Sequence, residues 1–164
     1  MICPNCNSKS TIKKRKVYVT EEKTKTYLFH CNNCDYLYLE NPNWLEIAYK
    51  KGFYGDTGYV YRNYNLVKKS LILFRIWKLY TLKKFPKACD IGAGTGMYAR
   101  LMRDNGYDFY GSDQYSEMLL IQPFIKNNNN YPIKTSFEVV EHLTSLPNFL
   151  KEELKNVDLF LFST

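Results

Sequence analysis

Four of the five cysteines stand in two pairs whose spacing suits a metal ion. Cys3 and Cys6 form the first Cys-x-x-Cys turn, and Cys31 and Cys34 form the second, after 24 intervening residues. Each turn aims two sulfur atoms at one point, and together they supply the tetrahedral thiolate set that Zn²⁺ prefers. We therefore predict a structural zinc centre here and interpret His30, beside Cys31, as an ordinary strand residue. Neither turn has the strand–turn–helix context of a redox pair.

The residues between the cysteine pairs predict a small β module. Residues 16–19 and 26–30 have the composition of short strands, and the polar residues 21–23 suit the turn between them. This is the layout of a zinc ribbon, which we expect over residues 1–40. So small a module buries little apolar surface, so metal binding would supply much of its folding free energy.

A strand, a glycine-rich turn and a helix follow one another from residue 88. Residues 88–91 have the pattern of a buried strand, Gly92 to Gly96 form the turn, and residues 97–105 suit a helix closed by Gly106. Glycines let backbone N–H groups approach a ligand closely, and the start of the helix adds partial positive charge. The combination predicts a ligand-binding cradle.

A second strand supplies an acidic residue at a matching distance. Residues 107–112 suit a strand that ends in Asp113, 21 residues after Gly92. A carboxylate at this place suits a bidentate hydrogen bond to ribose hydroxyls. The glycines are spaced G-x-G-x-G, not G-x-G-x-x-G, and the strand places Asp90 two residues before the first of them, which argues against a nicotinamide dinucleotide.

Three ordered motifs resemble those of class I methyltransferases, which use S-adenosylmethionine. The stretch DIGAGTG at 90–96 resembles their first motif, YGSD at 110–113 their second, and FEVVEHL at 137–143 the F-E-V-x-E-H signature of a large bacterial group. Many members of that group also begin with paired cysteine turns and an aromatic loop, so the resemblance covers almost the entire chain. It implies an α/β fold with a Rossmann-like, mostly parallel sheet behind a zinc-ribbon-like module.

The resemblance also implies residue roles. The glycines of the turn would line the methionine part of S-adenosylmethionine, Asp113 would bind the ribose, and Gln114 would lie near the adenine. Asp90 would hold the turn or the ammonium group, and Phe137 with Glu138 would border the sulfonium, with core packing as the alternative for Phe137. The implied cofactor-binding residues are Asp90, Gly92, Ala93, Gly94, Gly96, Asp113, Gln114, Phe137 and Glu138.

Glu141 and His142 are the candidate catalytic residues. One hypothesis is a general base that deprotonates a hydroxyl or amine acceptor, because imidazole titrates near neutral pH. The other is a local hydrogen-bonded pair that shapes the loop and caps a helix starting near Pro147. Both hypotheses stay open at this stage.

The middle of the chain, residues 41–85, predicts an aromatic lid loop followed by a basic helix. Tyr54, Tyr59 and Tyr61 are the lid candidates, in and just after a glycine- and tyrosine-rich stretch. Residues 66–85 suit a helix with apolar side chains on nearly every face. We expect this helix to pack between the zinc module and the main sheet, and to contact a partner subunit where one is present. The alternative is docking on a membrane surface. Residues 86–164 then form the methyltransferase domain.

Two features depart from the family pattern. A helix is expected near residues 118–126, and the short connection after it leaves little room for a third strand, which predicts a reduced sheet edge. Residues 158–164 form an apolar run typical of an interior strand, whereas family members continue with a helix and two more strands. We therefore expect a domain that is truncated after its fifth strand.

Composition and charge limit the function classes. The chain is 45% hydrophobic and 16% aromatic, which excludes a disordered protein, and its apolar runs are far shorter than the ~20 residues of a membrane span. The start of the chain lacks the pattern of a secretory signal, which predicts a cytoplasmic protein. Residues 1–40, 41–88 and 89–164 carry net charges of +3, +8 and −4.

By analogy with the family, the predicted acceptor is a small molecule or a sugar of a surface polysaccharide or natural product. The basic front half supports a rival hypothesis, a zinc-ribbon methyltransferase that binds or modifies RNA. Against it, the ribbon lacks clustered arginine–aromatic pairs for base stacking. A second rival is a catalytically silent, truncated scaffold. The sequence does not predict the oligomeric state.

Overall fold

The computed structural model describes residues 1–19, 24–40, 57–127, 130–143 and 145–164. The chain separates into two compact units, residues 1–51 with 142–152 and residues 52–141 with 153–164. The turn predicted at residues 21–23 and the lid candidate Tyr54 lie outside the described residues. The predicted boundaries of the three segments stay a prediction.

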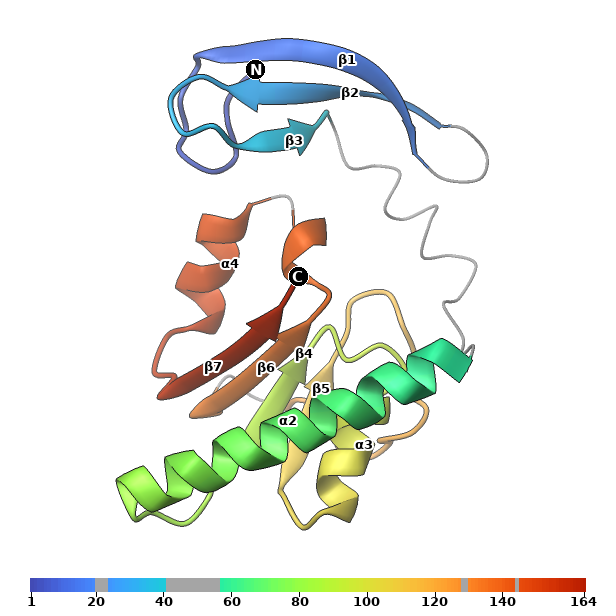
Figure 1. Cartoon of the computed structure of the whole chain (residues 1–164), viewed down its shortest axis with the longest axis vertical. Coiled ribbons are helices and arrows are strands. Elements are labelled where there is room, and N and C mark those ends of the chain that lie inside the picture. The colour runs from blue at the N-terminus through green and yellow to red at the C-terminus, as the bar shows by residue number, and fades with distance from the viewer. Residues whose placement is uncertain (20–23, 41–56, 128–129, 144) are drawn as a thin grey trace. The chain divides into compact units, whose positions relative to one another are not determined.

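An antiparallel sheet forms the N-terminal unit's main element. Strands β1 (Thr11–Val19), β2 (Thr24–Cys31) and β3 (Leu37–Leu39) lie in the order β1-β2-β3 (Figure 1). The first two strands are longer than predicted, and β3 was not predicted. The buried residues described in this unit are Cys3, Thr26, Phe29 and Cys31. So small a core makes the sulfur cluster a principal support of this sheet.

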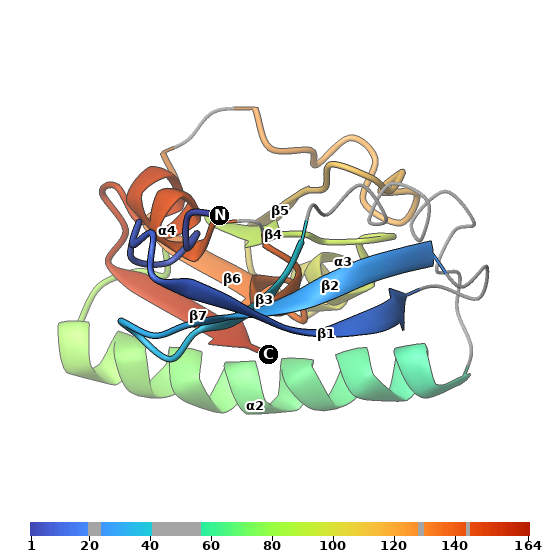
Figure 2. The ribbon, with the colours of Figure 1, turned by 90° about the horizontal axis from the view of Figure 1, so that it is seen from above.

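A four-stranded, entirely parallel sheet forms the second unit, in the order β5-β4-β6-β7 (Figures 1 and 2). Its strands are β4 (Ala88–Ile91), β5 (Phe109–Ser112), β6 (Ile133–Phe137) and β7 (Leu159–Ser163). This arrangement confirms the predicted α/β class. Among the described residues β7 pairs with β6 alone, and Phe162 is 53% exposed. The apolar run predicted as a strand at residues 158–164 thus forms β7, which lies at an edge of the sheet within the described residues.

Helices α2 (Thr57–Thr81) and α3 (Met97–Asp104) pack against each other and share a core with the sheet. Phe74 of α2 is fully buried among the rings of Phe85, Tyr107 and Phe109. Helix α2 begins at residue 57, not at residue 66, because no proline interrupts this stretch and its single glycine stands at the helix start. No helix within the described ranges is both long enough and apolar enough to cross a bilayer.

The segment between β5 and β6 is not the helix predicted near residues 118–126. It runs as turns that join the sheet edge at one isolated parallel bridge, between Gly111 and Ile125. Pro123 explains the difference, because proline has no backbone N–H and disfavours helical geometry in the residue before it. Among the described residues the only pairing at this edge is the bridge, so the predicted reduction of the sheet edge is confirmed.

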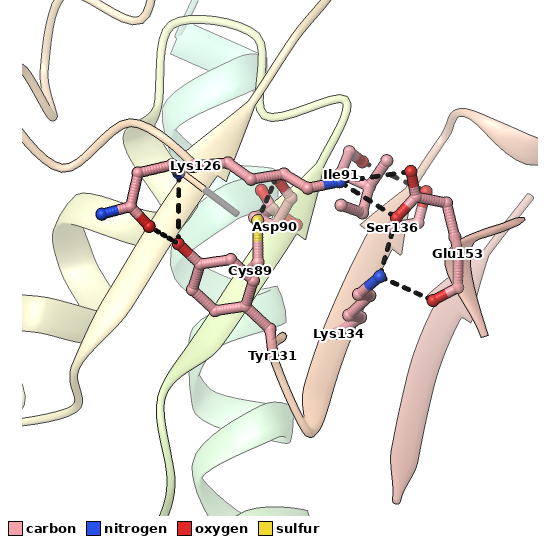
Figure 3. Close-up of polar contacts among 9 residues, drawn as sticks. Cys89, Asp90, Ile91, Lys126, Tyr131, Lys134, Ser136 and Glu153 are labelled. Carbon is pink, nitrogen blue, oxygen red and sulfur yellow. Dashed lines mark hydrogen bonds and ion pairs between the residues drawn. The ribbon is translucent and has the colours of Figure 1, made fainter. Parts of the chain in front are cut away.

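A buried charge cluster lies on one face of β6. Lys134 is 1% exposed, and its Nζ donates hydrogen bonds to the Glu153 carbonyl (2.6 Å) and carboxylate (2.8 Å) (Figure 3). Lys126 Nζ donates to both oxygens of the same carboxylate at 3.1 and 3.2 Å. Burial alone would raise the pKa of Glu153, but the two lysines bring it below its usual value. The cluster therefore fixes the last residue of α4 (Leu146–Glu153) to β6.

Candidate functional site

The four paired cysteines converge in the N-terminal unit. Their sulfur atoms all lie within 4.8 Å of one another, and Cys3 and Cys31 are fully buried. The closest contacts, Cys3 Sγ to Cys34 Sγ at 3.7 Å and Cys6 Sγ to Cys31 Sγ at 3.6 Å, are far too long for disulfides. Four thiols gathered at one point form the donor set that suits a zinc ion.

The two cysteine turns have the same backbone design. The N–H of Asn7 donates to the Cys3 carbonyl at 3.0 Å, and the N–H of Asp35 donates to the Cys31 carbonyl at 2.9 Å. Both donors adopt left-handed backbone angles, with φ of 57° and 55°, a conformation that asparagine and aspartate tolerate better than most residues. Each turn is thus closed locally by its own backbone hydrogen bond.

Asparagine side chains link the two turns reciprocally. Asn5 Nδ2 donates to Cys34 Sγ at 3.6 Å, and Asn33 Nδ2 donates to Cys6 Sγ at 3.5 Å. The bond from Asn33 is the main cause that lowers the pKa of Cys6 to about 6, followed by a backbone bond at Ser8. Cys6 is therefore a thiolate at neutral pH, the form that ligates metals.

His30 lies next to this cluster without joining it. Its Nε2 is 3.0 Å from Asp35 Oδ1, and the four-cysteine cluster does not include it. The ring thus pairs with the carboxylate of Asp35, just after the second cysteine turn, and His30 itself lies in strand β2, in line with its interpretation as an ordinary strand residue.

The glycine turn follows β4 at the carboxyl end of the parallel sheet. Gly92, Gly94 and Gly96 have φ angles of 74°, 58° and 85°, which side chains disfavour. The N–H groups of Gly92 and Ala93 both donate to the Ser112 carbonyl at the end of β5, at 2.8 and 3.0 Å. The turn therefore lies where the carboxyl ends of β4 and β5 meet.

Two neighbouring segments occupy the space beside the outer glycines. A Cβ on Gly92 would lie 2.3 Å from a methyl carbon of Val139, and a Cβ on Gly96 would lie 2.4 Å from Ile121. At Gly94 the nearest described atom would be the Tyr59 hydroxyl, at 3.4 Å. Among the described residues there is thus space for an added side chain at Gly94, and none at Gly92 or Gly96.

Asp113, the predicted ribose ligand, lies against the glycine turn. Its Oδ2 accepts a hydrogen bond from the Gly94 N–H at 2.8 Å, and its Oδ1 accepts from the N–H groups of Tyr115 and Ser116, both at 2.8 Å. The carboxylate therefore joins the turn to the segment after β5. Gln114, the adenine candidate, is exposed beside it.

Asp90 is 4% exposed and points across the sheet. Its Oδ1 accepts a hydrogen bond from Thr135 Oγ1 of β6. Burial raises the pKa of Asp90 to about 7, the Thr135 hydrogen bond opposes this, and the nearby Asp113 adds to it. Near neutral pH a large share of this carboxyl is thus uncharged.

Phe137 and Glu138 end strand β6. The Phe137 ring packs edge-on against Tyr98 of α3, with centroids 4.8 Å apart, and it adjoins the hydrophobic core. Glu138 has a φ of 57°, and its Oε1 accepts a hydrogen bond from Ser163 Oγ of β7 at 2.8 Å. The next residues, Glu141 and His142, are exposed in a short 3-10 turn, η1 (Val140–His142).

Tyr59 reaches the glycine turn from a helix, not from the predicted loop. It lies in the first turns of α2, and its hydroxyl is 3.0 Å from Thr95 Oγ1. Tyr61, also expected in the lid, lies on the same helix and is 70% exposed. Tyr59 was predicted as a lid residue, but its place in a helix was not predicted. Its partner Thr95 was not predicted either, because Thr95 is 36 residues away in the chain.

A parallel sheet with a glycine turn after its central strand and an aspartate after the neighbouring strand defines a Rossmann-like domain. The family model for the methyltransferase domain matches residues 62–163. This is more than half of the chain, so the protein belongs to the methyltransferase-domain family. A comparison with curated proteins gives no match.

The packing at Gly92 yields a stability prediction. Gly92→Ala and Gly106→Ala both place a side chain at a positive φ, which costs about 1 kcal/mol in each. Only Gly92→Ala also drives a Cβ into Val139, because nothing lies within 4 Å of a Cβ at Gly106. We expect Gly92→Ala to lose about 1–3 kcal/mol more in urea unfolding. Equal losses would mean that Val139 yields without cost.

The buried carboxyl of Asp90 yields a pH prediction. Its folded-state pKa of about 7 lies above its ordinary value of 3.8, so its contribution favours the fold below pH 4 and is lost as the pH rises through about 7. Relative to Asp90→Asn, the wild type should lose up to about 4 kcal/mol of unfolding free energy between pH 4 and 8. Parallel urea-stability profiles for the two proteins would contradict this.

Proposed function

We propose that this protein is an S-adenosylmethionine-dependent methyltransferase that acts on a small-molecule or sugar acceptor, with a structural zinc ion at Cys3, Cys6, Cys31 and Cys34. The observation that carries the donor assignment is the contact between the Asp113 carboxylate and the Gly94 N–H, at the carboxyl end of the sheet of a methyltransferase domain. The acceptor class rests on the resemblance of residues 137–143 to the bacterial group.

The residues around the turn fit the proposed donor. A Cβ at Gly94 would find open space apart from the Tyr59 hydroxyl, so a ligand could approach the backbone there. Within the described part of the chain no side chain caps the start of α3, which leaves backbone donors for the carboxylate of a methionine moiety. Asp113 Oδ2 accepts one hydrogen bond from the described residues, and its second lone pair suits a ribose hydroxyl.

When bound, S-adenosylmethionine supplies a methyl group activated by its sulfonium. The chain's own task is then chiefly to hold donor and acceptor in line. We assign this positioning to the glycine turn and Asp113, with Tyr59 steadying the turn through Thr95. Asp90, bonded to Thr135 and with its pKa raised to about 7 by burial, supports the turn and does not bind the ammonium group in this proposal.

Glu141 and His142 are the proposed acid–base residues for a hydroxyl or amine acceptor. Both side chains are exposed, which suits contact with an acceptor that arrives from solvent. Phe137 and Glu138 would lie between these residues and the donor. In this assignment Glu138 is oriented by Ser163, and Phe137 serves the core as well as the pocket.

Donor binding is tested by calorimetric titration with S-adenosylmethionine and S-adenosylhomocysteine. We expect the wild type to bind both in the micromolar range and Asp113→Asn to bind at least about tenfold more weakly, because a charged hydrogen bond contributes about 1.5 kcal/mol or more. The asparagine keeps one oxygen for the Gly94 N–H, so the turn should persist. Asp104→Asn, an exposed surface change that breaks an ion pair with Arg100, is the matched control. A folded wild type that binds neither ligand would contradict the donor assignment.

Zinc binding is tested by metal analysis of two cysteine variants. The wild type should hold one zinc ion per chain, and Cys34→Ala should lose most of it together with the stability of the N-terminal sheet. Cys89→Ala should retain the metal, because Cys89 is buried in β4 and burial raises its pKa to about 12. Equal zinc content in both variants would refute the four-cysteine site.

A further inference from the structure

Helix α2 has a second apolar face that the core does not use. Its inner face places Val67 and Phe74 in the core at 3% and 0% exposure. Ile72, Ile76 and Leu79 recur at spacings of four and three on the outer side, with 58%, 57% and 74% of their surfaces exposed. Residues at this spacing form one stripe on a helix. The all-round apolar pattern of the sequence thus arises from two opposite faces, of which only one is buried.

The same stretch is strongly basic. Residues 57–87 contain eight lysines and arginines and no aspartate or glutamate. Lys68, Lys69 and Arg75 are exposed beside the stripe. We call Ile72, Ile76 and Leu79 with these three cations the α2 outer face. Its occupant must therefore accept aliphatic side chains and carry negative charge.

A second copy of the chain meets the first requirement but not the second. Two α2 outer faces placed together would bring their lysines and arginines into a low-dielectric contact without any acidic residue of α2 to neutralise them. An RNA meets the second requirement and could stack on exposed rings of α2 such as Tyr80, but it would leave the aliphatic centre of the stripe in water, so it does not meet the first. The surface of an anionic membrane meets both requirements.

Residues beside the stripe support the membrane surface. Tyr80 and Leu82 are each 89% exposed at and just after the end of α2. A tyrosine ring is favoured at the depth of the lipid headgroups, and lysine stems extend along apolar surface while their ammonium groups stay in water. We infer that the α2 outer face docks this protein on anionic lipid bilayers, with the helix lying in the plane of the membrane surface.

The test is flotation of the zinc-loaded full chain with two kinds of vesicle, pure phosphatidylcholine and a two-to-one mixture of phosphatidylcholine and phosphatidylserine. The wild type should float with the mixed vesicles, far less with the neutral ones, and less as salt is raised. Ile72→Gln/Ile76→Gln/Leu79→Gln should lower the partition coefficient at least about tenfold. Lys68→Gln/Lys69→Gln/Arg75→Gln should remove the preference for phosphatidylserine.

The matched control is Ile12→Gln/Leu37→Gln, which removes two apolar side chains of similar exposure (47% and 54%) from the N-terminal sheet and should float like the wild type. Circular dichroism and zinc content verify the fold of each variant. The inference is overturned if the wild type does not float with mixed vesicles, or if the isoleucine–leucine variant floats equally well. It is also overturned if the wild type does not bind vesicles but forms a dimer in ultracentrifugation or binds RNA, and the isoleucine–leucine variant loses that association.

Discussion

The glycine turn after β4 depends on the absence of side chains at two of its residues. Val139, just beyond the end of β6, fills the space beside Gly92, and Ile121, from the segment after β5, fills the space beside Gly96. Two segments that are far apart in the chain thus converge on one turn. The backbone angles of the glycines and the packing of their neighbours are mutually required, so the turn, the end of β6 and the segment after β5 form one structural unit.

Elements that are determined by residues close together in the chain could be predicted from the sequence, and contacts between distant residues could not. The strand–turn–helix around Gly92 and the two cysteine turns follow from residues within a few positions of each other, and their elements formed as predicted. The helix expected near residues 118–126 did not form, because Pro123 outweighs the apolar periodicity around it. No sequence pattern showed that Lys134 would be buried, since its partner Glu153, which Lys126 also binds, is identified only by the fold.

The cysteine centre and the glycine turn are each stabilised by different interactions. The cysteine centre lies in a unit whose described core is very small, so its geometry rests on backbone turns and on the bonds from Asn5 and Asn33 to sulfur. The glycine turn lies in a unit with aromatic packing around Phe74 and a parallel sheet behind it. Loss of metal should therefore unfold the first unit while leaving the second one's packing largely intact.

Among the described residues, few backbone hydrogen bonds join the irregular segment between β5 and β6 to the sheet edge. Backbone hydrogen bonds join Gly111 to Phe124 and Lys126, and Leu120 to Thr95, while Asp113 anchors its start. Met118 and Ile121 of this segment are buried in the core, so changes in its length would be tolerated at its exposed residues and not at these two positions. The segment borders the proposed ribose and adenine positions, so substitutions at its exposed residues could alter what binds there without disturbing the sheet that supports it.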